Sequence, residues 1–373
     1  MNQFLALLVD GYRDLNARKL FWITLIISGL VICVAAIFGI KGTAITFAGS
    51  RMADFAPMDP LAWYTWGYGK IFIGVWLNWA AIALALISTA GLFPDLISSG
   101  SIDLYLSKPI SRLRLFLFKY VTGLLFVALQ VAVFSAASFL LFGIRAHAWR
   151  PGIFMAIPIV VCMFSYLFGF CVLLGVWTRS TIAAILLTVL LWFGMWLVQY
   201  SDSQLLQINV MIGMQVDRDK QSLATTDAEL REANGAGSST TRPASLTTER
   251  DSTAVELSDV EKTQARFVMI RNIVKGVKTV IPKTGETNDL LDRWLLSDSD
   301  ANEIVAAMTG SRSRRRQARG QVSRSPEEDV TLGAIQAQEI QRHTSMWYII
   351  GTSLLCEAVV VGFAAWIFCR RDY

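Results

Sequence analysis

The chain has 373 residues, of which 54% are hydrophobic and only 17% are charged, and its formal net charge is +5. This apolar fraction exceeds that of ordinary soluble domains, so an ordinary cytosolic enzyme is excluded. The 5 cysteines fall inside apolar stretches and there are only 2 histidines, so we expect neither a disulfide framework nor a metal centre.

The first 19 residues predict an amphipathic helix. Phe4, Leu8, Tyr12 and Leu15 recur at helical spacing, with charged residues on the other side. A helix of this kind lies flat in the membrane interface. The alternative is a helix that simply extends the first span inward. In both cases we expect residues 1–19 to anchor the chain.

Six apolar windows follow, each close to the 20 or so helical residues that cross a hydrocarbon layer about 30 Å thick. Unbroken apolar stretches satisfy their backbone hydrogen bonds as helices rather than as barrel strands. The predicted fold class is therefore an all-α membrane protein with six transmembrane helices. The windows are Leu20–Ile40, Ile71–Phe93, Leu115–Gly143, Ile153–Trp177, Thr181–Val198 and Trp347–Cys369.

Lysine and arginine in the short loops indicate the orientation, because cytoplasmic loops carry an excess of them. With the N-terminus inside, the cytoplasmic set is Arg13, Arg18, Lys19, Lys108, Arg112, Arg114, Lys119, Arg179, Arg370 and Arg371. The outer set is half as large and comprises Lys41, Arg51, Lys70, Arg145 and Arg150. We expect both termini in the cytoplasm of a bacterium and the chain in its inner membrane. The basic excess thus reflects orientation, and no nucleic-acid partner is expected.

Spans one to five occupy residues 20–198, and residues 346–373 hold the sixth span and the C-terminus. Between them, residues 199–345 predict a mainly helical insertion outside the cytoplasm, which could bind an extracytoplasmic partner. Periodicity favours helices over Asp217–Ala233 and Glu249–Val280. Asn234–Thr248 and Thr309–Pro326 have the composition of disordered segments. The arginine run in the latter is interpreted as a solvated linker.

The connection between the second and third spans, residues 94–114, is the most informative stretch. Pro94 and Asp95 suit a helix start, and Gly100 interrupts that helix. Pro109 favours an extended Lys108 and begins the next helix. We therefore expect a short helical piece along the cytoplasmic face, bracketed by tight turns.

The string Gly100-x-x-Asp103-Leu-x-Leu-Ser-Lys-Pro-Ile-Ser-Arg112, followed by Lys119, resembles the cytoplasmic loop of type-2 ABC exporter permeases. Within that superfamily it is most similar to the permeases associated with nitrous oxide reductase maturation. The family usually has a glutamate ahead of the glycine, and here the nearest carboxylate is that of Asp95. The resemblance covers the six predicted spans, the N-terminal helix and the presence of an extracytoplasmic insertion between the fifth and sixth spans. It does not cover the insertion in detail, which is much longer than the family's usual short hairpin.

The resemblance implies a transmembrane permease subunit whose loop docks on a separate ABC ATPase and receives the movement driven by ATP. The coupling residues would be Asp95, Gly100, Asp103, Ser107, Lys108, Pro109, Ser111 and Arg112. The chain has no G-x-x-x-x-G-K-[ST] phosphate loop. It is therefore not expected to be an enzyme by itself, and ATP and Mg would be bound by the partner. A second permease copy or a paralogue is also implied.

Glu357 is a carboxylate near the middle of the last apolar window. A charge there costs about 2.5–3.5 kcal/mol on insertion scales, so the side chain should face protein or a water-filled cavity. We predict a place in the translocation pathway, together with Asn78 and Gln130. The alternative is a hydrogen-bonded packing residue that has Asn78 or Gln130 as its partner. For the whole chain, the competing function is a non-transporting scaffold or assembly factor that presents the insertion.

Overall fold

The computed structural model describes residues 19–41, 44–47, 49–54, 60–98, 111–235, 241–295, 333–334, 336–337, 339–341 and 343–371. These residues form two compact units. The bundle unit contains the described residues up to Trp196, those from 280 to 295 and those from 344 onward. The hairpin unit contains Leu197–Thr279 and the described residues between 333 and 343.

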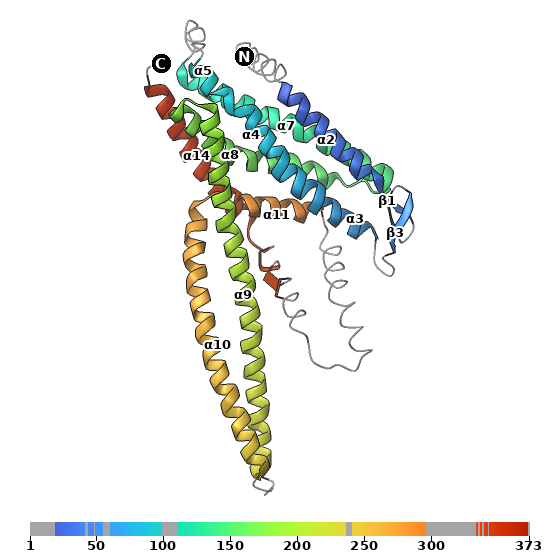
Figure 1. Cartoon of the computed structure of the whole chain (residues 1–373), viewed down its shortest axis with the longest axis vertical. Coiled ribbons are helices and arrows are strands. Elements are labelled where there is room, and N and C mark those ends of the chain that lie inside the picture. Colours follow the sequence, from blue (N-terminus) through green and yellow to red (C-terminus); the bar gives the residue numbers. More distant parts are fainter. Residues whose placement is uncertain are drawn as a thin grey trace. The chain divides into compact units, whose positions relative to one another are not determined.

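The bundle unit is mostly helical (Figure 1). Its elements in chain order are α2 (Lys19–Ile37), β1 (Phe38–Lys41), β2 (Ala44–Phe47), β3 (Ser50–Asp54), α3 (Pro60–Tyr68), the π-helix η1 (Gly69–Ala81), α4 (Ile82–Thr89), the 3-10 helix η2 (Ala90–Leu92), α5 (Pro94–Ser98), α7 (Arg112–Arg145), the 3-10 helix η3 (Pro151–Met155), α8 (Ala156–Thr178), the first part of α9 (Thr181–Gly235), α11 (Thr284–Leu295) and α14 (Met346–Arg370).

Among the described residues, 5 helices are long and apolar enough to cross a membrane. They are Tyr64–Ile97, Arg112–Arg145, Pro151–Thr178, Thr181–Glu232 and Met346–Arg370. The molecule therefore has the architecture of an all-α, multi-pass membrane protein. The first predicted window forms the shorter apolar helix Phe21–Ile37, so the count of six spans stays a prediction.

Helix α2 nevertheless runs the length of the bundle. Its 19 residues span about 28 Å at 1.5 Å per residue. It packs against α4 and α7, from the end of the bundle that carries α5 to the opposite end (Figure 1). That length is close to the thickness of a hydrocarbon layer, which is compatible with a sixth crossing.

A small antiparallel sheet, in the order β1-β2-β3, follows α2, and its first strand takes the last three residues of the predicted window Leu20–Ile40. Phe38 pairs with Phe47 across the first two strands, and Ala44 pairs with Asp54 across the next two. Gly49, at φ +84, makes the tight turn between β2 and β3. Strands of 4 or 5 residues are too short to give a readable alternation in sequence, so the sheet was missed.

Helix α11 crosses the end of the bundle opposite α5 (Figure 1). It packs against α8, η3 and η1. Leu290 and Leu291 are buried on its inner face. Residues 280–295, which the prediction assigns to the insertion, therefore pack with the bundle unit. The amphipathic pattern of α11 explains the difference, since its apolar side completes the bundle's core.

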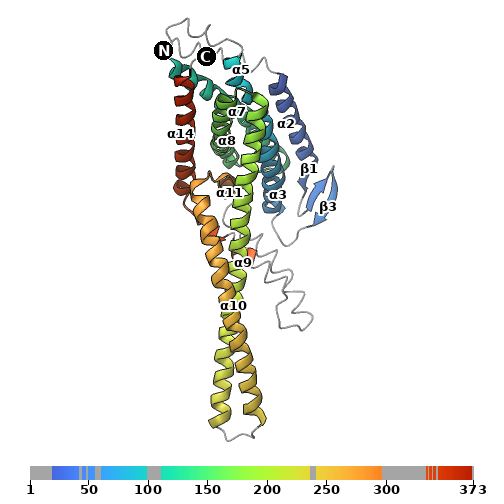
Figure 2. The ribbon, with the colours of Figure 1, turned by 60° about the vertical axis from the view of Figure 1, so that its left-hand side comes forward.

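In the hairpin unit, α9 beyond Trp196 and α10 (Thr241–Val280) lie side by side (Figures 1 and 2). Ion pairs across the hairpin join Lys220 to Glu261 at 2.9 Å and Arg250 to Asp227 at 2.7 Å. They show that the helices run antiparallel. Both predicted helices are present within these longer ones.

Helix α10 begins earlier than the sequence suggested. Its first residue, Thr241, lies inside Asn234–Thr248, which was predicted to be disordered. Pairing with α9 compensates for the polar composition, and Thr248 donates a hydrogen bond to the carbonyl of Ala244 one turn back. The other segment predicted to be disordered, Thr309–Pro326, and the N-terminal helix predicted over 1–19 lie outside the described residues, apart from Lys19.

Candidate functional site

A buried carboxylate lies where α7, α8 and α14 meet. The side chain of Glu357 in α14 is buried. The Tyr120 hydroxyl on α7 donates to Glu357 Oε1 at 2.7 Å, and the Ser165 hydroxyl on α8 donates to Oε2 at 2.8 Å. Of the two environments that the sequence left open for Glu357, protein or a water-filled cavity, the structure has protein hydroxyl groups around the carboxylate. We refer to Glu357, Tyr120 and Ser165 as the carboxylate cluster.

Small residues and aromatic rings position this cluster. A Cβ atom built on Gly169 of α8 would lie 3.1 Å from Val361 and 3.7 Å from Glu357, so a glycine lets α8 and α14 approach here. The ring of Tyr120 stacks on Phe168, with centroids 5.2 Å apart. A Cβ atom on Gly123 would lie only 2.7 Å from that same ring. The Phe168 ring thus packs against α7 at both Tyr120 and Gly123, on one face of the helix, and this packing positions the Tyr120 ring.

The Ser165 hydroxyl has two possible acceptors. Its oxygen lies 2.8 Å from Glu357 Oε2 and 2.8 Å from the carbonyl oxygen of Cys162, one turn earlier in α8. A hydroxyl carries a single proton, so it can direct that proton fully toward only one of them. The cluster can therefore change its hydrogen-bond arrangement without moving a backbone atom.

The other two residues predicted for the pathway lie apart from this cluster. Asn78 of η1 donates through its amide nitrogen to Asn288 of α11. Gln130 of α7 lines a small cavity with Ser28 and Val160, and its Nε2 has no hydrogen-bond partner among the described residues. The partners of Glu357 were therefore predicted wrongly, and the structure supplies hydroxyl groups in place of amides.

A buried lysine was missed by the sequence analysis. Lys283 precedes α11, and its Nζ donates to the Thr352 hydroxyl of α14. Its backbone N–H donates to Ser353 Oγ at 3.0 Å, and Nζ lies 4.3 Å from the centroid of the Tyr348 ring. Ser353 is one helical turn from Glu357, so α14 presents polar contacts on successive turns of one face. The signal available in the sequence was a lysine between Pro282 and an amphipathic helix.

The predicted coupling loop is described only at its two ends. Gly100, Asp103, Ser107, Lys108 and Pro109 lie outside the described residues.

At the first end, Asp95 is exposed on α5. At the second, Ser111 caps α7, and its Oγ accepts from the N–H of Arg114 at 3.3 Å. Arg112 Nη1 donates to the carbonyl oxygen of Arg371, just after α14, at 2.7 Å.

The two ends of the loop are packed together through aromatic rings. Phe93, before α5, lies 4.9 Å from Phe116 of α7, and Phe368 of α14 lies 5.7 Å from Phe116, between ring centroids. All three rings are almost fully buried. The loop residues therefore begin and end on one aromatic cluster, formed by Phe93, Phe116 and Phe368, that includes the last span.

No group of histidine, cysteine and acidic residues suited to a metal ion occurs in the described part of the chain. No protein-family model matches the chain, and no curated protein or solved structure is significantly similar to it.

Proposed function

We propose that the chain is the permease subunit of an ATP-driven exporter of the type-2 ABC class. The observation that carries the proposal is a continuous path of contacts from the predicted coupling loop into the carboxylate cluster. Arg112 and Phe116 lie in the first turns of α7 and contact α14 at the loop's base. Tyr120 lies one turn further along α7 and bonds Glu357.

The path gives a mechanical route for coupling. A displacement of the loop would move the start of α7, because Ser111 and Arg112 join the two directly. A close-packed interior transmits such a shift with little loss. Tyr120 would then move relative to Glu357, and Ser165 could redirect its proton to the Cys162 carbonyl. The bundle would thus alternate between two hydrogen-bond arrangements, driven from the loop.

The proposal also assigns partners and location. ATP and Mg are held by a separate ATPase at the cytoplasmic face, and a second permease copy or a paralogue completes the transport path. The chain lies in a bacterial inner membrane with both termini inside, and residues 199–345 lie on the extracytoplasmic side. The basic residues Arg112, Arg114, Arg179, Arg370 and Arg371, which belong to the expected cytoplasmic set, support this orientation.

Mild-detergent purification of the full chain from its native cell tests the proposal. We expect an ATPase with a phosphate-binding loop to co-purify, and a photo-crosslinker at Ser107 to react with it. Arg112→Glu should reduce co-purification, because it reverses a charge at the loop's base. Arg114→Glu is the matched control, since Arg114 is exposed in the same turn of α7.

Two results would overturn the transport proposal. One is a stable chain that carries no nucleotide-hydrolysing partner and crosslinks to none. The other is a reporter fusion at Ser238 that proves to be cytoplasmic. The first would favour the scaffold, for which the long helical hairpin is the supporting observation. The second would contradict the scaffold as well, because both functions place the insertion outside the cytoplasm.

A further inference from the structure

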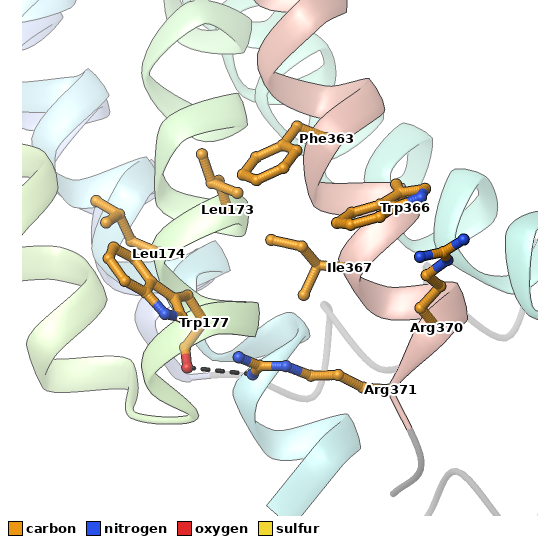
Figure 3. Close-up of a pocket in the computed structure, with 8 residues that line it drawn as sticks. All are labelled: Leu173, Leu174, Trp177, Phe363, Trp366, Ile367, Arg370 and Arg371. Atoms are coloured by element: carbon orange, nitrogen blue, oxygen red, sulfur yellow. Dashed lines mark hydrogen bonds between the residues drawn. The ribbon is translucent and has the colours of Figure 1, made fainter.

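A groove of about 520 Å³ runs between α8 and α14. Figure 3 shows side chains of the two helices facing one another across it. Its walls are apolar along most of their length, and its positive charges are gathered at one end. The lining residues are Leu173, Leu174, Trp177, Phe363, Trp366, Ile367, Arg370 and Arg371.

The two arginines at the mouth are held differently. Arg371 donates through Nη1 to the carbonyl oxygen of Val176 at 2.9 Å, at the C-terminal end of α8. Nη1 also donates to the carbonyl oxygen of Trp177 at 3.2 Å (Figure 3). These bonds fix its guanidinium beside the groove. Arg370 is exposed and lies 4.8 Å from the centroid of the Trp366 ring. Stacking on an aromatic face leaves the edge of a guanidinium available for planar acceptors.

We propose that this groove binds an anionic phospholipid, with an acyl chain against the apolar walls and the headgroup phosphate on Arg370 and Arg371. Basic pockets between transmembrane helices bind acidic headgroups. Arginine suits a phosphate because its N–H donors match the spacing of the oxygen atoms. The tryptophans Trp177 and Trp366 line the groove together with the arginines, and amphipathic rings of this kind favour the headgroup region.

Charge complementarity distinguishes the lipid from a second copy of the chain. A two-fold interface places the same patch on both partners, so pairing over this groove would bring the arginines of both copies together. A lipid phosphate neutralises them. The site would exist in a transporter and in a scaffold alike, so it does not depend on the proposed function.

Native mass spectrometry of the full chain tests the lipid site. The protein is reconstituted in vesicles of equal parts phosphatidylglycerol and phosphatidylcholine, then extracted and analysed for retained lipid. We expect wild type to retain phosphatidylglycerol preferentially. Arg370→Gln should lower that retention about fivefold, because it removes one of the two arginines that line the groove and would contact the retained headgroup. Arg114→Gln removes an exposed charge outside the groove and should leave retention unchanged.

A second variant distinguishes lipid binding in the groove from attraction by the general surface charge. Leu174→Trp fills the apolar wall without changing charge, and it should also lower phosphatidylglycerol retention. Equal retention in wild type and Arg370→Gln, or an equal loss in Arg114→Gln, would overturn the proposal. So would efficient disulfide crosslinking between two copies that carry Phe363→Cys, because the groove would then be covered by protein.

Discussion

The two units each bury a carboxylate, but they satisfy it in opposite ways. In the bundle unit, Glu357 receives hydrogen bonds from the hydroxyls of Tyr120 and Ser165. In the hairpin unit, Asp202 of α9 is paired with two cations of α10. Lys278 Nζ bonds Oδ2, and Arg271 Nε lies 3.5 Å from Oδ1.

Glu357 can therefore exchange hydrogen-bond partners, whereas Asp202 cannot. Hydroxyls are neutral and can rotate, so the carboxylate cluster permits a second hydrogen-bond arrangement. The ion triad of Asp202, Arg271 and Lys278 is fixed by charge, and its two cations are seven residues apart along α10, which keeps both on the seam with α9. The ion triad is thus suited to fixing how α9 and α10 align. The carboxylate cluster is instead suited to switching between two hydrogen-bond arrangements.

Removal of Asp202 gives the largest expected effect. Asp202→Ala leaves the positive charges of Lys278 and Arg271 in a site where the side chains of Asp202 and Lys278 are only 5% and 10% exposed. Breaking a buried pair by removing one partner costs about 3–5 kcal/mol. Hydrogen exchange of the α10 amides in the full chain should report this loss as faster local opening.

Asp227→Ala is the matched control for that experiment. The Asp227 carboxylate of α9 is also paired with an arginine of α10, Arg250, but both side chains are nearly half exposed. An exposed pair contributes about 0–1 kcal/mol, so exchange should change little. Similar losses in the two variants would mean that burial does not distinguish the ion triad from surface pairs.

Overpacking beside the carboxylate cluster gives an intermediate effect. Gly123→Ala places a methyl group 2.7 Å from the Phe168 ring, on which Tyr120 stacks. We expect a loss of about 1–3 kcal/mol, because an almost fully buried ring has little room to shift. Thermal unfolding of the purified chain in detergent measures it.

Gly362→Ala is the control, because a Cβ atom there has no neighbour within 4 Å among the described residues. It lies in α14, so it tests the same substitution in another apolar helix. Equal melting temperatures for the two variants would show that the position of Tyr120 is not set by close packing.

The features that could be predicted from the sequence are those that depend only on the length and composition of a single segment. The long apolar helices could be predicted because a crossing helix needs a long unbroken apolar run. Glu357 stood out because a carboxylate inside such a run is costly. These features are local, so no neighbour has to be known.

The partners of Glu357 could not be read in the same way. Tyr120 and Ser165 come from two other helices, and their contacts depend on the rotation of each helix about its axis. Sequence periodicity does not fix that rotation when every face of a span is apolar. Gly169 was the available clue, since a glycine marks a close helix approach. The early start of α10 was hidden for a related reason, because its stability comes from pairing with α9.

The smallest expected effect on stability is that of Glu357→Gln. This variant also tests whether Glu357 has a role in transport that is independent of protein stability. The glutamine oxygen can still accept from Tyr120, and its NH₂ group can donate to Ser165 when that hydroxyl donates to the Cys162 carbonyl. No polar atom of the carboxylate cluster is then left without a partner, so we expect a change below about 1 kcal/mol. Thermal unfolding measures it.

Glu357→Ala provides the contrast, because it removes the 2.7 Å acceptor of the buried Tyr120 hydroxyl. It should cost more than Glu357→Gln, by about 1–3 kcal/mol. If Glu357 serves transport, Glu357→Gln should fold normally and still lower the substrate-stimulated ATPase activity of the assembled complex. Unchanged turnover and export would reduce Glu357 to a packing residue. Equal destabilisation by Gln and Ala would instead mean that the carboxyl group itself holds the helices together, and the distinction between the carboxylate cluster and the ion triad would fail.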